Sequence, residues 1–160
     1  MIVLGIDPGI ETTGFAVLRV VGAERELVEY GVIRTSSTLA VPERLAIIHT
    51  DIQGILDRYA DIEIAGVEEL FFAKNVTSAF KVGQARGVIL FTLHAAGVTI
   101  EEVKPVEVKA EVTGNGGADK QAVQRMIQFE FGLDSPPTPD DAADAVAIAL
   151  CTALRQRQNQ

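Results

Sequence analysis

Acidic residues stand at the ends of three elements that the sequence predicts. An almost unbroken apolar run of strand-forming residues begins the chain and ends at Asp7, where Pro8-Gly9 stops the strand. The other acids of this kind are Glu68 or Glu69, at the end of a later strand, and Asp140, Asp141 and Asp144, at the start of the last helix. Because open α/β sheets bind ligands at the carboxyl ends of their strands, these acids are the candidates for chemistry.

The chemistry that such acids favour is divalent-cation binding. If the first and fourth strands are parallel neighbours, Asp7 lies beside one of the two glutamates. Alternation along the fourth strand selects Glu68 over Glu69. Glu68 shares the face of Ile62 and Ile64. Hard cations such as Mg²⁺ bind through a few carboxylates plus water and substrate phosphates, and a pair of them can activate water and stabilise a leaving oxygen.

The last helix makes Asp144 the most informative of these acids. Between residues 142 and 153 only Asp144 and Thr152 are polar, so we expect the helix to be largely buried and Asp144 to be a buried acid. Asp141 lies one turn away on the same face, and the two carboxylates repel unless a cation or a shared proton relieves them. The four acids that fit a metal site are Asp7, Glu68, Asp141 and Asp144.

Three of these acids also have a purely structural explanation. Asp7 suits an Asx turn before Pro8-Gly9, and Glu68 alone is an ordinary charge at a strand end. The pattern Thr138-Pro-Asp-Asp141 suits a capping box, and acids favour helix N-termini. Asp144 has no such explanation. The metal site therefore rests on the convergence of the four acids and not on one of them.

Length and composition predict one compact intracellular domain over 1–160. The 160 residues are 48% apolar and 22% charged, which suits a chain that buries most of its apolar surface. A lone cysteine, Cys151, gives no internal disulfide framework, and the sequence predicts neither a signal peptide nor a membrane span, so the expected location is the cytoplasm. The net charge of −8 disfavours nonspecific attraction to nucleic acid unless a metal neutralises a local cluster.

Periodicity and turn residues predict the element order β-β-β-α-β-α-β-α-α-α, a mixed five-stranded α/β sheet with helices on both faces. The first three strands form an antiparallel meander, with a turn at 22–25, and the next helix returns the chain parallel to an earlier strand. The predicted strands are 1–7, 13–21, 26–35, 62–70 and 98–103, and the predicted helices are 42–59, 75–96, 105–112, 119–131 and 140–156.

A stretch without acids, residues 70–100, follows the fourth strand. Its cations suit either phosphate contacts or a plain solubilising surface. Two more lysines flank a glycine-rich loop at 114–119, where backbone N–H groups and a helix start favour an anion. Phe71 and Phe72 suit either the core or stacking on bases. The cations concerned are Lys74, Lys81, Arg86, Lys109 and Lys120.

The long predicted helix carries two glycines, Gly83 and Gly87, four residues apart. Each glycine in a helix costs about 1 kcal/mol against alanine. The pair therefore favours close packing against another backbone, which includes that of a second subunit.

Five stretches, spread over essentially the whole chain, carry a family resemblance. They are Leu4-Gly-Ile-Asp-Pro-Gly9 with Thr13-Gly14, Val67-Glu-Glu-Leu-Phe-Phe-Ala-Lys-Asn75, Gly83-Gln-Ala-Arg-Gly87, Val108-Lys109 with Lys120, and Asp141-Ala-Ala-Asp-Ala-Val-Ala-Ile-Ala149. In this order they closely resemble the RuvC family of Holliday-junction resolvases. The first stretch is shared by many relatives of the ribonuclease H fold, whereas the second and third are far more specific.

The resemblance implies a ribonuclease H-like domain that acts as a homodimer on four-way DNA junctions, where each subunit nicks one of two opposed strands. It also implies Mg²⁺, with Mn²⁺ as a substitute, and the branch-migration proteins RuvA and RuvB as partners. By the same resemblance, Asp7, Glu68, Asp141 and Asp144 are the metal-binding catalytic acids, Lys109 and Lys120 contact phosphate, and Phe71 meets bases near the crossover. Lys120 is the lysine that we expect to stabilise charge developing on the phosphate.

Other functions are compatible with parts of the sequence. The Asp-Pro-Gly-(x)₄-Gly turn is similar to the phosphate loop of actin and sugar-kinase ATPases, but those proteins place nucleotide between two such domains and this chain has room for one. A non-catalytic junction-binding module is the second alternative.

Without the four ionised site acids the net charge of the chain is −8 − (−4) = −4, so acidity extends beyond the site. Asp140 is an additional acid that can replace or assist Asp141.

Overall fold

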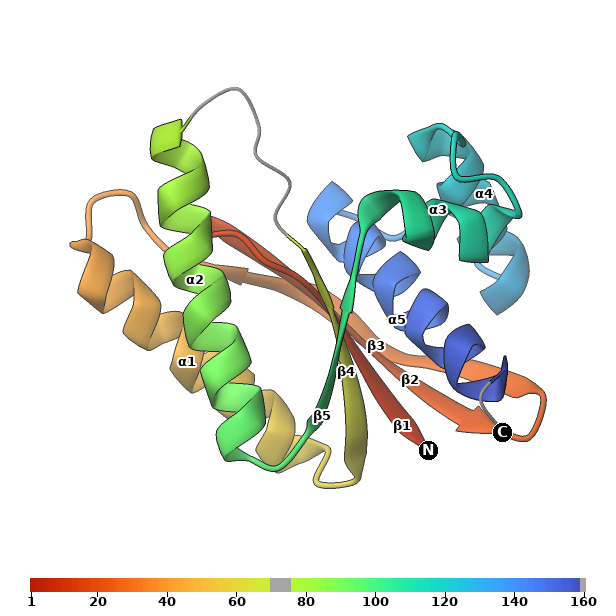
Figure 1. The fold of residues 1–160 in the computed structure, drawn as a ribbon, viewed down its shortest axis with the longest axis horizontal. Coiled ribbons are helices and arrows are strands. Elements are labelled where there is room, and N and C mark those ends of the chain that lie inside the picture. Colours follow the sequence, from red (N-terminus) through yellow and green to blue (C-terminus); the bar gives the residue numbers. More distant parts are fainter. Residues whose placement is uncertain (70–75, 159–160) are drawn as a thin grey trace.

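Five strands form one mixed sheet between two groups of helices (Figure 1). The computed structural model describes residues 1–69 and 76–158. The strands are β1 (Ile2–Asp7), β2 (Thr12–Val21), β3 (Glu24–Arg34), β4 (Ile62–Glu68) and β5 (Thr99–Val103), and the helices are α1 (Val41–Arg58), α2 (Val76–Ala95), α3 (Pro105–Thr113), α4 (Lys120–Phe131) and α5 (Asp140–Gln158). The predicted element order is thereby confirmed.

The strands lie in the order β3-β2-β1-β4-β5. β1, β2 and β3 form the predicted antiparallel meander, and β4 and β5 run parallel to β1. The register pairs Ile6 with Val67, so the next residues of the two strands, Asp7 and Glu68, reach the same edge of the sheet. The crossover through α1 thus brings two acids together that are 61 residues apart, because 68 − 7 = 61.

Helices cover both faces of the sheet, α1 and α2 on one and α3, α4 and α5 on the other (Figure 1). Alternation along β1 divides its side chains between two cores. Leu4 and Ile6 pack with α1 and α2, whereas Val3 packs with the helices of the opposite face. Asp7 follows the alternation of Val3 and therefore faces α5.

Three glycines of the sheet let α5 approach its surface closely. A Cβ atom at any of them would come closer than 3.0 Å to an atom of α5, a separation that real Cβ atoms essentially never show. The affected pairs are Gly5 with Ala145, Gly14 with Asp141, and Gly66 with Thr152. Because backbone and small side chains meet here, the start of α5 is held directly over the carboxyl end of β1.

Two local details differ from the predictions. The turn between β2 and β3 is the tight pair Gly22-Ala23, with Gly22 at φ 58°, and β3 already begins at Glu24. The register between β1 and β4 shifts after Ile62, which therefore packs in the core under α1 and does not share the face of Glu68. Such a shift inverts the alternation of a strand, which a strict period of two cannot foresee.

The helix boundaries lie within a few residues of those predicted. The predicted cap Asn75, the loop 71–75 and Leu70 lie outside the described residues. Gly114 and Gly132 close α3 and α4 in the left-handed conformation that favours glycine. In the part of the chain that the structure describes, none of the helices is both long and apolar enough to cross a membrane.

Candidate active site

The turn after β1 leaves the Asp7 carboxylate unused by local structure. Thr13, which is fully buried, closes this turn by donating from Oγ1 to the Gly9 carbonyl at 2.6 Å. Within residues 1–69 and 76–158, no hydrogen bond reaches the Asp7 carboxylate. The Asx-turn explanation for Asp7 is therefore not supported, and the acid is free for other chemistry.

Burial and neighbouring acids act together on Asp7. Burial is the larger cause, and repulsion from Glu68, Asp144 and Asp141 adds to it, so that the pKa of Asp7 rises to about 8 against the opposing charge of Lys120. Four acids from β1, β4 and α5 thus lie close enough to perturb one another. This is the convergence that the sequence predicted.

The pKa values of Glu68 and Asp144 are raised as well. Burial, followed by repulsion from Asp144, raises the pKa of Glu68 to about 7, whereas Lys109 opposes the rise. Burial also raises the pKa of Asp144 above its ordinary value, against the hydrogen bond and charge of Lys120. A cluster of this kind favours a bound cation, since ionising Asp7, Glu68 and Asp144 together without one is unfavourable.

Asp144 is only partly buried, contrary to the prediction. Its side chain is 41% exposed, and its Oδ2 lies 3.2 Å from Lys120 Nζ, which lies equally close to Oδ2 of Asp140. The rest of α5 from residue 142 to 153 is buried as predicted. The difference arises because Asp144 belongs to the second turn of α5, where the helix borders an open cleft.

The capping-box explanation for Asp141 is not supported either. Thr138 and Asp141 are both described, and no hydrogen bond joins them. The N–H groups of Ala142 and Ala143, in the first turn of α5, donate to the Pro139 carbonyl at 3.0 Å and 3.2 Å. The Asp141 side chain is therefore not committed to the helix start.

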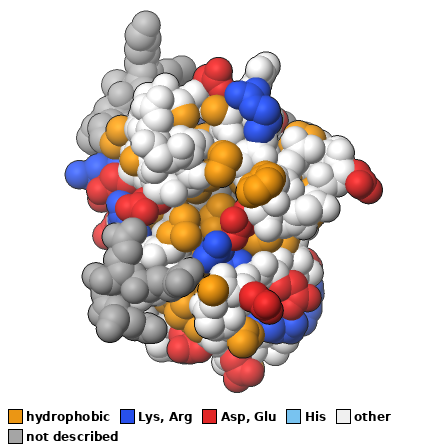
Figure 2. Space-filling view, turned by 90° about the vertical axis from the view of Figure 1, so that its right-hand side faces the viewer, with side chains coloured by type: hydrophobic (Ala, Val, Ile, Leu, Met, Phe, Trp, Pro, Cys, Tyr) orange, Lys and Arg blue, Asp and Glu red, His pale blue; other side chains and the backbone are white. Residues whose placement is uncertain are grey.

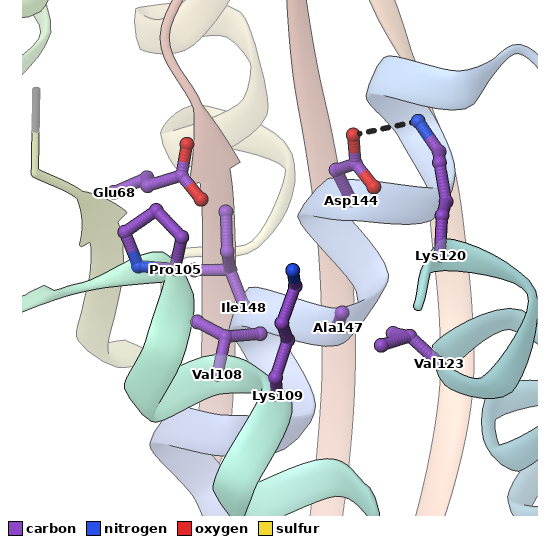
Figure 3. Close-up of a pocket in the computed structure, with 9 residues that line it drawn as sticks. All are labelled: Glu68, Pro105, Val108, Lys109, Lys120, Val123, Asp144, Ala147 and Ile148. Carbon is purple, nitrogen blue, oxygen red and sulfur yellow. Dashed lines mark hydrogen bonds and ion pairs between the residues drawn. The ribbon is translucent and has the colours of Figure 1, made fainter. Parts of the chain in front are cut away.

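A cleft of about 300 Å³ opens beside the acids, between α3, α4 and α5 (Figure 3). Lys109 rises from α3 toward the space between the Glu68 and Asp144 carboxylates, and Lys120 enters from the start of α4. Figure 2 shows this face of the molecule, where apolar side chains line a central hollow beside basic and acidic ones. The cleft is lined by Glu68, Pro105, Val108, Lys109, Lys120, Val123, Asp144, Ala147 and Ile148.

The acids suit a hard divalent cation by their chemistry. Among the described residues, no three Asp, Glu, His or Cys side chains have the close arrangement of a preformed metal cage. All candidate donors are carboxylate oxygens, which Mg²⁺ and Mn²⁺ prefer, and burial together with repulsion between the acids raises the pKa values of Asp7 and Glu68. The residues present therefore fit such a cation.

The other predicted contact residues divide into three groups. Lys81 is exposed on α2 beside a second hollow of about 450 Å³, which Asp141 and the turn 9–12 also line. Arg86 is held within the chain, because its Nε donates to the Glu68 carbonyl at 2.9 Å and its guanidinium pairs with Glu102. Its contact with DNA stays a prediction. Lys74 and Phe71 lie outside the described residues.

The sequence did not predict the apolar residues that line the cleft, nor the ion pair between Lys120 and Asp140. Val108 and Ile148 are buried core residues that also border the cleft. No chemical signal distinguishes them from other core positions. The sequence suggested Asp140 as an additional metal ligand, but the structure pairs it with Lys120. The two residues belong to different helices, and the sequence contains no pattern that predicts an ion pair between them.

This arrangement defines a class of protein. A mixed sheet of this strand order, with acids at the ends of β1 and β4 and at the start of a helix packed across them, is that of a ribonuclease H-like nuclease. The family model for the crossover junction endodeoxyribonuclease RuvC matches residues 3–152. The chain therefore belongs to the RuvC family.

Individual relatives agree. The RuvC of Heliobacterium modesticaldum is 45% identical over 153 residues, which cover 96% of this chain and 94% of the relative. The structure of Thermus thermophilus RuvC in complex with a Holliday junction substrate matches with a TM-score of 0.93 and 38% identity, over 99% of this chain and 96% of that chain. The yeast mitochondrial Holliday junction resolvase Ydc2 is similar in fold, with a TM-score of 0.69 and 15% identity over 98% of this chain and 83% of that chain.

Proposed function

We propose that this protein is a divalent-metal-dependent endonuclease that resolves four-way DNA junctions by nicking two opposed strands. The observation that carries the proposal is the convergence of Asp7, Glu68, Asp141 and Asp144 beside a cleft that contains two lysines. Membership of the RuvC family supports the substrate, because a Thermus thermophilus relative is described in complex with a Holliday junction. The cleavage of labelled four-way junctions against linear duplex, with and without Mg²⁺, tests it.

The four acids would hold Mg²⁺ or Mn²⁺ at the edge of the sheet. Such a cation supplies Lewis-acid stabilisation and an activated water for phosphodiester hydrolysis. Lys109, from the floor of the cleft, is placed to bind a phosphate oxygen of the strand. Lys120 neutralises Asp140 and Asp144 in the free protein, and it can turn to the phosphate once these acids have another partner.

Replacing Lys120 by alanine is expected to slow cleavage strongly. Removing one charged donor at a developing charge costs roughly 10²–10³-fold in rate. The measurement is the single-turnover cleavage rate at saturating protein and Mg²⁺, together with the junction affinity in Ca²⁺. We expect the rate to fall by about this factor and the affinity to change much less, because one phosphate contact contributes little to the total.

Lys104→Ala is the matched control for Lys120→Ala. Lys104 is an exposed lysine that precedes α3 and does not line the cleft. We expect its loss to leave the single-turnover rate unchanged. A Lys120→Ala variant that cleaves as fast as the Lys104→Ala variant would remove Lys120 from the mechanism.

The exposed side of α2 suits a homodimer. Phe80 and Phe91 are 70% and 69% exposed, and eleven residues, three helical turns, separate them. Gly87 lies between them on the same side, and nothing in the described chain lies within 4 Å of a Cβ atom built there. A bare glycine between two exposed aromatic rings favours contact with a second copy of α2.

Phe91→Asp is expected to shift the protein from dimer to monomer. A charge in place of a buried aromatic contact typically weakens an interface by several kcal/mol, and about 1.4 kcal/mol is tenfold in affinity. Sedimentation at micromolar concentration measures the change. Phe129→Asp is the control, because Phe129 is similarly exposed, at 82%, but lies on α4. If both variants remain dimers, the interface is not on this side of α2.

The remaining contacts are proposed from the sequence and from the family resemblance. Phe71 meets bases near the crossover, as the family resemblance implies, and Lys74, Lys81 and Arg86, the cations of the stretch 70–100, contact DNA phosphates. RuvA and RuvB are the proposed partners, and the cytoplasm is the proposed location. The exposed position of Lys81 beside the turn after β1 supports its part in these contacts.

A further inference from the structure

The turn that follows Asp7 has a second, buried attachment to the rest of the fold. Thr35, directly after β3, is buried, and its Oγ1 donates to the Ile10 carbonyl at 2.5 Å. Its backbone N–H donates to the Glu11 carbonyl at 3.1 Å. The two bonds fasten the outer half of the turn, whereas Thr13 closes the inner half.

A buried arginine determines the direction of the Thr35 hydroxyl. Arg44 of α1 donates from Nε to Thr35 Oγ1 at 2.7 Å. An arginine can only donate, so the hydroxyl must accept from it and must give its own proton to the Ile10 carbonyl. The order of donors is therefore fixed, from Arg44 through Thr35 to the turn.

The surroundings of Arg44 are unfavourable for a charge. Its side chain is 5% exposed, and its Nη2 is buried without a hydrogen-bond partner, 4.0 Å from the largely exposed carboxylate of Glu11. Burying a guanidinium with so few partners costs free energy, and an apolar residue at this position of α1 would avoid that cost. Stability of α1 alone does not account for an arginine here.

The acids supply a reason for a rigid turn. Asp7 accepts no hydrogen bond among the described residues, and Glu68, Asp141 and Asp144 repel it. Among the described residues, its position therefore depends on the backbone of β1 and of the turn that follows.

We infer that Thr35 and Arg44 are positioning residues, which hold the turn after Asp7 so that its carboxylate keeps its place among mutually repelling acids. Groups that orient a metal-binding side chain from behind typically change metal affinity or activity by about 10–100-fold when they are removed. The inference deepens the proposed function and rests on it for the substrate.

Thr35→Val tests the inference, because it removes the hydroxyl and keeps the shape. The first measurement is the Mn²⁺ concentration that gives half of the maximal thermal shift of the DNA-free protein. The second is the single-turnover rate of junction cleavage. We expect the midpoint to rise about tenfold and the rate to fall at least as much, with partial recovery at high Mn²⁺ and an unchanged junction affinity in Ca²⁺.

Thr92→Val is the matched control. Thr92 is a buried threonine of α2 whose hydroxyl lies 2.8 Å from both His49 and the Val88 carbonyl, away from the acids. We expect a similar loss of thermal stability with no change in the Mn²⁺ midpoint. Thr35→Ser, which restores the hydroxyl, should restore the midpoint, and Arg44→Met should shift it in the direction of Thr35→Val.

The outcomes separate the inference from the proposed function. A Thr35→Val midpoint equal to that of the wild type, or a shift of the same size in Thr92→Val, overturns the positioning role. If Thr35→Val does not fold, the Arg44→Met midpoint decides in the same way. A wild-type protein that binds Mn²⁺ but cuts no junction overturns the proposed function, and the midpoints still decide the role of Thr35 and Arg44.

Discussion

Asp7→Asn is expected to abolish junction cleavage and at the same time to stabilise the metal-free fold. Cleavage should fall by at least about 10³-fold, because the residue at the centre of the acid cluster is lost and a carboxylate donor to the cation is lost with it. Junction binding in Ca²⁺ should remain. Gain of stability with loss of activity is the signature of a group that serves chemistry and not folding.

The stability gain has a defined pH dependence. The pKa of Asp7 is about 8 in the folded protein and 3.8 in the unfolded chain, so the folded state binds the proton more tightly. The contribution of Asp7 to wild-type stability is therefore fully present below pH 3.8 and is lost as the pH rises through 8. Asparagine does not titrate, so the difference in melting temperature between variant and wild type should widen from pH 4 to 8.

The size of this effect can be bounded. A rise from 3.8 to about 8 corresponds to at most about 6 kcal/mol. Partial exposure reduces it, and a few kcal/mol amounts to roughly 5–10 °C in a chain of this length. Calorimetry in EDTA from pH 5 to 8.5 measures it, and Mg²⁺ should reverse the order by stabilising the wild type alone.

Asp61→Asn is the control for Asp7→Asn. Asp61 is an exposed acid just before β4, at the opposite end of the strand from Glu68. It should change neither the cleavage rate nor the pH dependence. If Asp7→Asn is less stable than the wild type at pH 8 without metal, the acid cluster is not strained and the electrostatic account of the site is wrong.

The acids of the site could be predicted from local sequence patterns, because they lie at the ends of regular strands and helices. Asp7 and Glu68 end strands that could be recognised from apolar runs, and a parallel pairing of β1 with β4 follows from the length of the crossover. The choice of Glu68 over Glu69 also agrees with the structure, where Glu68 lines the cleft. The choice is correct because Ile64 and Gly66 share the face of Glu68. Ile62 does not share that face, because the register shifts between Ile62 and Ile64.

Features that depend on contacts between distant elements could not be predicted. Burial of Asp144 was inferred from the apolar residues around it on α5, but its exposure depends on the cleft that α3 and α4 leave open. Arg44 and Thr35 have no pattern of their own, since an arginine in an amphipathic helix normally faces solvent. From sequence alone, a glycine within a strand only indicates a weaker strand. The reason for the sheet glycines is their contact with α5, which the sequence does not show.

Gly14→Ala is expected to disable the site through the backbone. The added methyl group would overlap the Asp141 carbonyl, and neither β2 nor α5 can move away without loss of other contacts. β2 is hydrogen-bonded on both sides, to β1 and β3, and α5 is also packed against Gly5 and Gly66. Overpacking of this kind costs about 1–3 kcal/mol.

The larger effect of Gly14→Ala should be on the rate. The methyl group pushes the start of α5 away from β1 and carries Asp141 and Asp144 with it, and a displacement of about 1 Å can cost about 10²-fold in rate. Gly54→Ala is the matched control, because Gly54 lies on α1 with nothing within 4 Å of a Cβ atom, and it should gain up to about 1 kcal/mol without a change in rate. Both rates are measured well below the melting temperature, so unfolding does not contribute. A Gly14→Ala variant that is less stable yet cleaves at the wild-type rate would show that the distance between α5 and β1 does not set the geometry of the acids.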